Sequence, residues 1–257
     1  MQGVTLFCFA SSYGVALGLE LWRQFRPRQI LYYLAVGFGA AGLLAQSIYL
    51  AVRAQTVGWM VLLAWVLAVF YLYGCIHYRK WAWGIFVLPL VLGLLAFSAW
   101  TGPGADPLPP AGDRFWAFLH VGLLLLAAVG VCVGFLAGVM YLIQARRLRA
   151  KTSPRWGLRL LNLERLEQMN RRAVDLAFPL LTAGLVIGLV LMLQQPLPRW
   201  NDPRVSGAGV LWLAFLVLLV LRYGWRLRGR AFALLTILAF FLLLLSLFLP
   251  HPTGGAS

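Results

Sequence analysis

The stretch WAFLHVGLLLLAAVGVCVGFLAGVMYLI, residues 116–143, decides the fold class. It contains no Asp, Glu, Lys or Arg, and it exceeds the roughly 20 residues that a helix needs to cross a bilayer core about 30 Å thick. The basic sequence QARRLR follows directly, at residues 144–149. The stretch therefore predicts a membrane-spanning helix with one basic end.

Apolar runs of this kind fill the rest of the 257-residue chain, which is 62% hydrophobic and 11% charged. This composition excludes a water-soluble enzyme, a disordered chain and a collagen-like fibre, because too few polar side chains are present to cover a globule. We predict an all-α fold, a polytopic membrane bundle of eight transmembrane helices that forms a single integral membrane domain over residues 1–257. The predicted spans are residues 3–22, 30–52, 59–77, 82–100, 116–143, 173–194, 208–224 and 231–249.

The basic residues between these runs predict the topology. Eighteen of the 22 Lys and Arg residues fall in alternate loops, and the four others are Arg53, Arg114, Arg199 and Arg204. Basic loops stay in the cytoplasm, so we expect both the N and the C terminus to be extracytoplasmic. No Lys or Arg precedes the first run, which we therefore expect to be a retained helix rather than a cleaved signal. Most of the net charge of +15 is then explained by topology and lipid contact, and no nucleic-acid partner is expected.

Several polar and small residues have structural explanations. Glu20 and Asp175 lie at cytoplasmic span ends beside arginines, which favours ion pairing or helix capping, and Gln46 is expected to hydrogen-bond to a neighbouring helix. Glycines four apart, at 130, 134 and 138 and at 184 and 188, allow close helix contact. Residues 158–172, LRLLNLERLEQMNRR, fit either an amphipathic helix on the cytoplasmic leaflet, leading into the sixth span, or a solvated connector.

Two histidines are candidate ligands for a haem iron. His120 lies near the outer end of the fifth predicted span, one turn after Trp116, and His251 follows the outer end of the eighth. Neutral imidazole is a common axial ligand, and two histidines at one depth can supply both axial positions. Each histidine also fits an interfacial or solvated polar residue, as does His77 at the opposite end of the third span. The three cysteines form no C-x-x-C pair, which argues against a zinc site, a dithiol relay and a c-type haem attachment motif in this chain.

The loop QQPLPRWNDPRVSGAG, residues 194–209, lies on the same predicted side. Trp200 offers a flat apolar face, and Arg199 and Arg204 can pair with carboxylates such as haem propionates. Asp202 and Pro203 also have the sequence of a helix start, with Asp as the N-cap residue and Pro in the first turn.

In chain order, these segments resemble the cytochrome c assembly family of CcsA and HemX type. The resemblance rests on FPLLTAGL at 178–185, on the loop with W-N-D-P-R, on RYGWRLRGR at 222–230 and on a last span with an outer histidine. It extends upstream to LHV at 119–121 and to residues 62–90. The family's full loop motif is W-x-W-D-P-[KR]-E, whereas this chain has Asn201 at the second tryptophan position and Val205 at the acidic one.

The resemblance implies a haem-handling protein of cytochrome c maturation in the bacterial inner membrane. It implies that haem b is held transiently at the extracytoplasmic face, with His120 and His251 as axial ligands and with Trp116, Trp200, Asp202, Arg199 and Arg204 around it. The chain would be at most the haem-delivery subunit of a cytochrome c synthase, without a nucleophile of its own, and its partners would be a second assembly subunit and apocytochrome c. The alternative is a HemX-like scaffold or regulator of haem metabolism without stable haem binding. A small-molecule permease ranks lower, because no predicted span has a charged residue at its centre.

Overall fold

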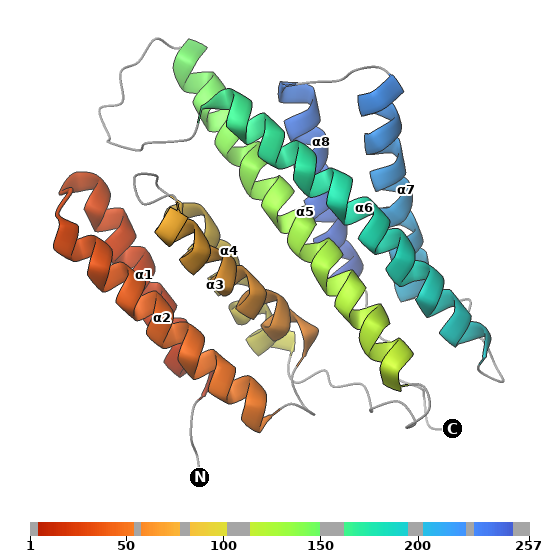
Figure 1. Cartoon of the computed structure of the whole chain (residues 1–257), viewed down its shortest axis with the longest axis horizontal. Coiled ribbons are helices and arrows are strands. Elements are labelled where there is room, and N and C mark those ends of the chain that lie inside the picture. Colours follow the sequence, from red (N-terminus) through yellow and green to blue (C-terminus); the bar gives the residue numbers. More distant parts are fainter. Residues whose placement is uncertain are drawn as a thin grey trace. The chain divides into compact units, whose positions relative to one another are not determined.

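The computed structural model describes residues 5–53, 58–77, 83–101, 114–149, 162–194, 203–224 and 229–248 (Figure 1). In these ranges the chain forms eight α-helices, which confirms the all-α prediction. The helices are α1 (Leu6–Phe25), α2 (Gln29–Val52), α3 (Trp59–His77), α4 (Gly84–Thr101), α5 (Arg114–Arg149), α6 (Leu163–Leu193), α7 (Pro203–Gly224) and α8 (Arg230–Phe248).

Each helix coincides with one predicted apolar run, and the largest differences are at the basic ends of α5 and α6. Among the described residues, five helices are long and apolar enough to cross a membrane, namely α2, α3, α5, α6 and α7. The apolar parts of α4 and α8 are shorter, at Gly84–Trp100 and Arg230–Leu245. The chain is therefore rich in membrane-length helices, while the number of spans and the location of the termini stay predictions.

The residues that precede the sixth predicted span are helical from Leu163 onward. They continue into the span without a break, so that α6 has 31 residues. Asn162 caps the helix, because its side-chain Oδ1 accepts a hydrogen bond from the backbone N–H of Arg165 at 3.2 Å. The amphipathic segment is thus the first part of α6 from Leu163, and residues 158–161 lie outside the described ranges.

The chain divides into two compact units of four helices each, α1–α4 and α5–α8. In the first unit α1 packs on α2 and α4, while α3 packs on α2 and α4. Gln46 is fully buried where three of these helices meet. Its Oε1 accepts a hydrogen bond from the hydroxyl of Tyr13 on α1 at 2.8 Å, and its Nε2 donates to the carbonyl of Val61 on α3 at 3.0 Å. The expected interhelical hydrogen bond of Gln46 is confirmed.

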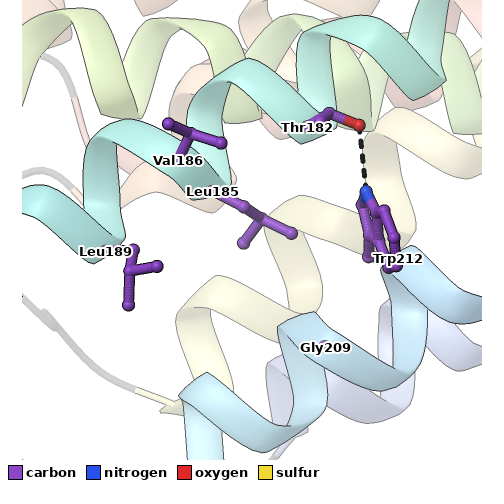
Figure 2. Close-up of a pocket in the computed structure, with 6 residues that line it drawn as sticks. All are labelled: Thr182, Leu185, Val186, Leu189, Gly209 and Trp212. Atoms are coloured by element: carbon purple, nitrogen blue, oxygen red, sulfur yellow. Dashed lines mark hydrogen bonds between the residues drawn. The ribbon is translucent and has the colours of Figure 1, made fainter.

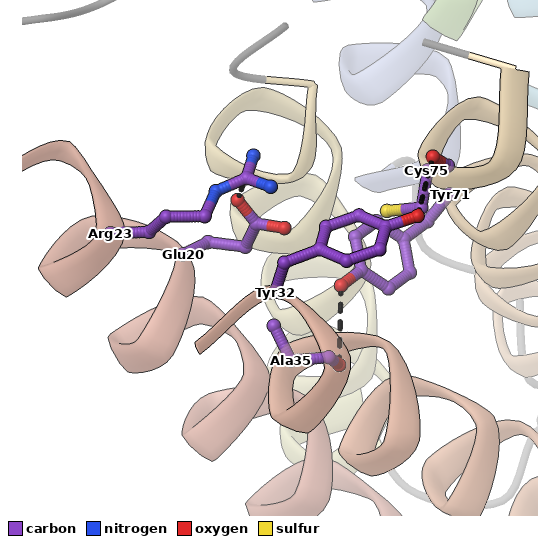
Figure 3. A network of polar contacts seen from close by, with 6 residues as sticks. All are labelled: Glu20, Arg23, Tyr32, Ala35, Tyr71 and Cys75. Atoms are coloured by element: carbon purple, nitrogen blue, oxygen red, sulfur yellow. Dashed lines mark hydrogen bonds and ion pairs between the residues drawn. The ribbon is translucent and has the colours of Figure 1, made fainter. Parts of the chain in front are cut away.

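A second polar network ties the first unit together at the end of α1 (Figure 3). Glu20 is 1% exposed, and its carboxylate pairs with Arg23 at 2.9 Å, as the sequence predicted. The Arg23 guanidinium lies 5.4 Å from the ring centre of Tyr32, whose hydroxyl donates to the carbonyl of Cys75 at 2.9 Å. The last turn of α3 is therefore bound to α2 by a side-chain hydrogen bond.

In the second unit α5 packs on α6 and α8, and α7 packs on both α6 and α8. The glycines at 130, 134 and 138 of α5 face these neighbours. A β-carbon at Gly130 would lie 2.9 Å from Ala177 Cβ, and one at Gly138 would lie 3.1 Å from the carbonyl oxygen of Ala233. The prediction that these glycines permit close helix packing is confirmed.

Candidate functional site

The side chain of His120 sits in the second turn of α5 and points at α6. Its Nδ1 lies 2.7 Å from the backbone carbonyl oxygen of Gly184. A carbonyl oxygen can only accept a hydrogen bond, so Nδ1 carries the proton and donates. In the neutral ring Nε2 then has the free lone pair, which is the form in which an imidazole ligates a metal.

Two glycines on α6 make room for this imidazole. A β-carbon at Gly188 would overlap the ring, with Nδ1 only 2.9 Å and Nε2 only 3.2 Å away. A β-carbon at Gly184 would lie 2.8 Å from Cδ2 of Leu124, one turn further along α5. The two glycines thus bring the helices close enough for the histidine to reach the carbonyl of Gly184.

Sequence reasoning assigned Gly184 and Gly188 to packing and did not connect them with His120. The signal was present, because small residues four apart on one span mark a surface of close helix approach. What the sequence lacked was the register between α5 and α6, which places residue 120 opposite residues 184 and 188.

The remaining predicted site residues are described in part or not at all. Trp116 lies one turn before His120 on α5 and is 51% exposed. The backbone of Arg204 lies in the first turn of α7, but its side chain is outside the description. Arg199, Trp200, Asp202 and His251 also lie outside the described residues. Helix α7 begins at Pro203, as expected for proline in a first turn.

The segment FPLLTAGL lies between His120 and α7. On one side of α6 it supplies the Gly184 carbonyl to His120. On the other side Phe178 stacks on Trp212 of α7 at 5.9 Å, and the hydroxyl of Thr182 accepts a hydrogen bond from Trp212 Nε1 at 2.9 Å. This segment therefore couples the histidine-bearing helix to the helix that follows residues 195–202.

Beside this contact α6 and α7 line an apolar hollow of about 220 Å³ that is open on one side (Figure 2). Its lining residues are Thr182, Leu185, Val186, Leu189, Gly209 and Trp212. Helical spacing places the residues that α6 contributes on the side of that helix away from Gly184 and Gly188. The hollow is thus separate from the contact between His120 and α6.

Comparison with known proteins identifies the family. A family model described as "Cytochrome C assembly protein" matches residues 54–251, from just after α2 to His251. The chain belongs to the cytochrome c assembly protein family. Together with the apolar helices, this membership shows an integral membrane protein. The two N-terminal helices α1 and α2 precede the matched region.

Curated relatives of this family member carry the description "Cytochrome c biogenesis protein CcsA". One from Synechococcus sp. (strain JA-2-3B'a(2-13)) is 29% identical over 241 residues, covering 69% of this chain and 68% of the relative. One from Synechococcus elongatus is 28% identical, covering 59% of this chain and 61% of the relative. One from Gloeobacter violaceus is 25% identical, covering 84% of this chain and 82% of the relative.

These names support the CcsA side of the sequence resemblance and give no support to the HemX-like alternative. The chain spans less than two thirds of the length of the Synechococcus elongatus relative. No solved structure matches the chain significantly.

Proposed function

We propose that this protein binds haem at the extracytoplasmic side of the membrane and presents it for cytochrome c maturation. The observation that carries the proposal is the hydrogen bond from His120 Nδ1 to the carbonyl of Gly184. Histidines that ligate metals typically donate their second ring N–H to a carbonyl or carboxylate, which fixes the tautomer and the ring orientation. His120 has this arrangement, so the donor set fits a haem iron at Nε2.

His251 is the proposed second axial ligand. Helices α5 and α8 are antiparallel, because Phe135 stacks on Phe240 at 4.0 Å while Gly138 faces Ala233. From Phe135 back to His120 the helix rises about 22 Å. From Phe240 to the end of α8 it rises about 12 Å, and the three residues up to 251 can span about 10 Å more. These lengths allow His251 to reach the depth of His120.

The loop between α6 and α7 supplies the other proposed contacts. Arg199 and Arg204 would pair with the two propionates, Trp200 and Trp116 would offer flat apolar faces, and Asp202 would cap α7. Bound haem would supply the vinyl groups to which the thiols of apocytochrome c add, so the protein itself needs no nucleophile. A second assembly subunit and apocytochrome c are the proposed partners, and the bacterial inner membrane is the proposed location.

The orientation follows from the charge bias. Eighteen of 22 basic residues lie in loops on one side of the eight proposed spans, which makes that side cytoplasmic. The N-terminal end of α5 and the C-terminal end of α8 then face outward, together with both chain termini.

Haem content tests the proposal. The full chain is expressed with ample haem, purified in mild detergent and examined by absorption spectroscopy. We expect a low-spin spectrum typical of two histidine ligands, which His120→Ala and His251→Ala each abolish. The matched control is His77→Ala, an exposed histidine at the end of α3, which should leave the spectrum unchanged. A wild-type protein without haem, or unchanged spectra in both ligand variants, would refute the function.

A further inference from the structure

Two arginines from different helices converge on one carboxylate in the unit α5–α8. Arg171 and Asp175 are on α6, and Arg222 is on α7. The Nε of Arg171 lies 3.6 Å from Oδ2 of Asp175, and the Nη1 of Arg222 lies 3.6 Å from Oδ1. The hydroxyl of Tyr223 donates a hydrogen bond to the same Oδ1 at 3.1 Å.

This cluster carries more donors than its carboxylate satisfies. Both arginine distances exceed the 2.7–3.2 Å of an N–H···O hydrogen bond, and two guanidinium groups share a single negative charge. Arg222 is 11% exposed, with its guanidinium 4.8 Å from the ring centre of Phe232 on α8. Its Nη1 is buried and has no hydrogen-bond acceptor among the described residues. A buried charged donor without an acceptor is costly. Arg171 is 57% exposed, so a further anion can reach its guanidinium and add negative charge beside the buried Arg222.

We propose that this cluster binds the phosphate of an anionic phospholipid. A phosphate offers several acceptor oxygens to the planar fork of an arginine, which recognises it bidentately. Arg172, in the N-terminal half of α6, and Arg230, the first residue of α8, are exposed and add further positive charge to this unit. Under the proposed topology the cluster faces the cytoplasmic leaflet, whose anionic lipids are attracted to such basic pockets between helices.

The apolar hollow lies on the same face of α6 as the arginine cluster and can take part of an acyl chain. Arg171, Asp175, Phe178 and Thr182 follow one another at spacings of three and four, so they lie on one face of α6. Thr182 begins the apolar hollow that Figure 2 shows, about 10 Å along the helix from Asp175. One leaflet of the bilayer core is about 15 Å thick, so a chain anchored at the arginines reaches the hollow.

Native mass spectrometry of the purified full chain tests the site, with phosphatidylglycerol as the probe and phosphatidylcholine of the same chains as the comparison. We expect one phosphatidylglycerol to be retained per chain, and the double variant Arg171→Gln with Arg222→Gln to weaken its binding about tenfold. The matched control removes the same charge from exposed arginines, as Arg146→Gln with Arg165→Gln, and should bind like wild type.

A variant of the hollow keeps the test decisive if the arginine variant fails to fold. A β-carbon at Gly209 meets nothing within 4 Å, and Gly209 lines the hollow, so we expect the side chain of Gly209→Leu to fill part of it. It should weaken binding of long-chain phosphatidylglycerol severalfold and leave a short-chain form unaffected, whereas Gly93→Leu on α4, equally unobstructed, should change neither.

Three results would overturn the proposal. The first is that the control arginine variant loses as much phosphatidylglycerol binding as Arg171→Gln with Arg222→Gln, and the second is that phosphatidylcholine binds as strongly as phosphatidylglycerol. The third is that haem displaces the phosphatidylglycerol, which would assign the arginines to propionates instead. Lipid binding is measured independently of haem content, so these outcomes are distinct from failure of the proposed haem function.

Discussion

The imidazole of His120 donates a hydrogen bond from Nδ1 to the carbonyl of Gly184, across the contact between α5 and α6. Gly188, one turn further along α6, leaves the space that the ring occupies. The two glycines therefore have different roles, since Gly184 supplies the hydrogen-bond acceptor and Gly188 leaves space for the imidazole ring. Neither role needs a side chain, and both depend on close approach of α5 and α6.

Replacing Gly188 with alanine should displace the imidazole. The new β-carbon would meet the ring, which would have to turn away from the Gly184 carbonyl and lose the hydrogen bond that orients it. Loss of such a partner typically weakens metal binding about ten- to a hundredfold. Haem retained per purified protein, measured by absorption during dilution or competition with apomyoglobin, should fall accordingly.

The control for this variant is Gly122→Ala on α5. Its β-carbon would meet nothing within 4 Å, so the substitution changes helix propensity without touching the histidine. Haem retention should match wild type. If Gly188→Ala retained as much haem as wild type, this would contradict the role of the glycine in positioning His120. That conclusion would hold whether or not His120 is an axial ligand.

Much of the fold follows from the sequence, for a physical reason. Long apolar runs must satisfy their backbone groups internally in a bilayer, so each becomes a helix, as α5 does from the run at 116–143. The interhelical bonding of Gln46 and the pairing of Glu20 also follow from general costs of burial, since polar groups inside a helix bundle need partners. None of these inferences needs to know which helices are neighbours.

The site could be predicted only in part, because it depends on register. His120 and Gly184 are 64 positions apart, and the contact between them exists only because the small residues of α6 face α5 in one particular register. The spacing of residues along one helix does not determine its register against another helix. The convergence of His120 with His251 has the same requirement and stays a prediction, supported by the antiparallel packing of α5 on α8.

Arg199 and Arg204 should matter more to haem retention than the far more numerous arginines of the basic loops. Only guanidinium groups at the proposed extracytoplasmic face can reach the propionates there. Replacing both with Gln should lower haem retention about tenfold without affecting membrane insertion. The matched control is Arg26→Gln with Arg28→Gln, between α1 and α2. Equal haem content in both double variants would remove the proposed role.

Cysteine labelling should place the C terminus and the segment between α4 and α5 outside the cytoplasm. Cys8 is exposed while Cys75 and Cys132 are buried, so a Cys8→Ser background leaves few reactive thiols in the described helices. In that background, Ser257→Cys and Ala105→Cys should react with an impermeant maleimide added to intact cells or spheroplasts. If these cysteines reacted only after the membrane was opened, the orientation would be the opposite of the one proposed, with His120 on the cytoplasmic side.

Removing the Gln46 side chain should weaken the packing of the first unit. In Gln46→Leu the buried hydroxyl of Tyr13 loses its acceptor, which we expect to cost about 1–3 kcal/mol of unfolding free energy. Tyr13→Phe should also destabilise, because Gln46 Oε1 then lacks its donor. The measurement is unfolding of the purified protein in mixed detergent and SDS micelles.

The double variant separates this hydrogen bond from general disturbance of the core. Tyr13→Phe combined with Gln46→Leu removes donor and acceptor together, so its cost should be smaller than the sum of the single costs. We expect a difference of about 0.6 kcal/mol and at most about 1.7 kcal/mol, the mean and the maximum of such couplings measured in a membrane bundle. Ser47 is the matched comparison, because its hydroxyl accepts from Trp65 Nε1 at 2.8 Å and not from Tyr13. Ser47→Ala with Tyr13→Phe should therefore be additive. Additivity in the Gln46 cycle as well would show that this hydrogen bond adds nothing to the stability of the first unit, and that the buried glutamine has to be explained in another way.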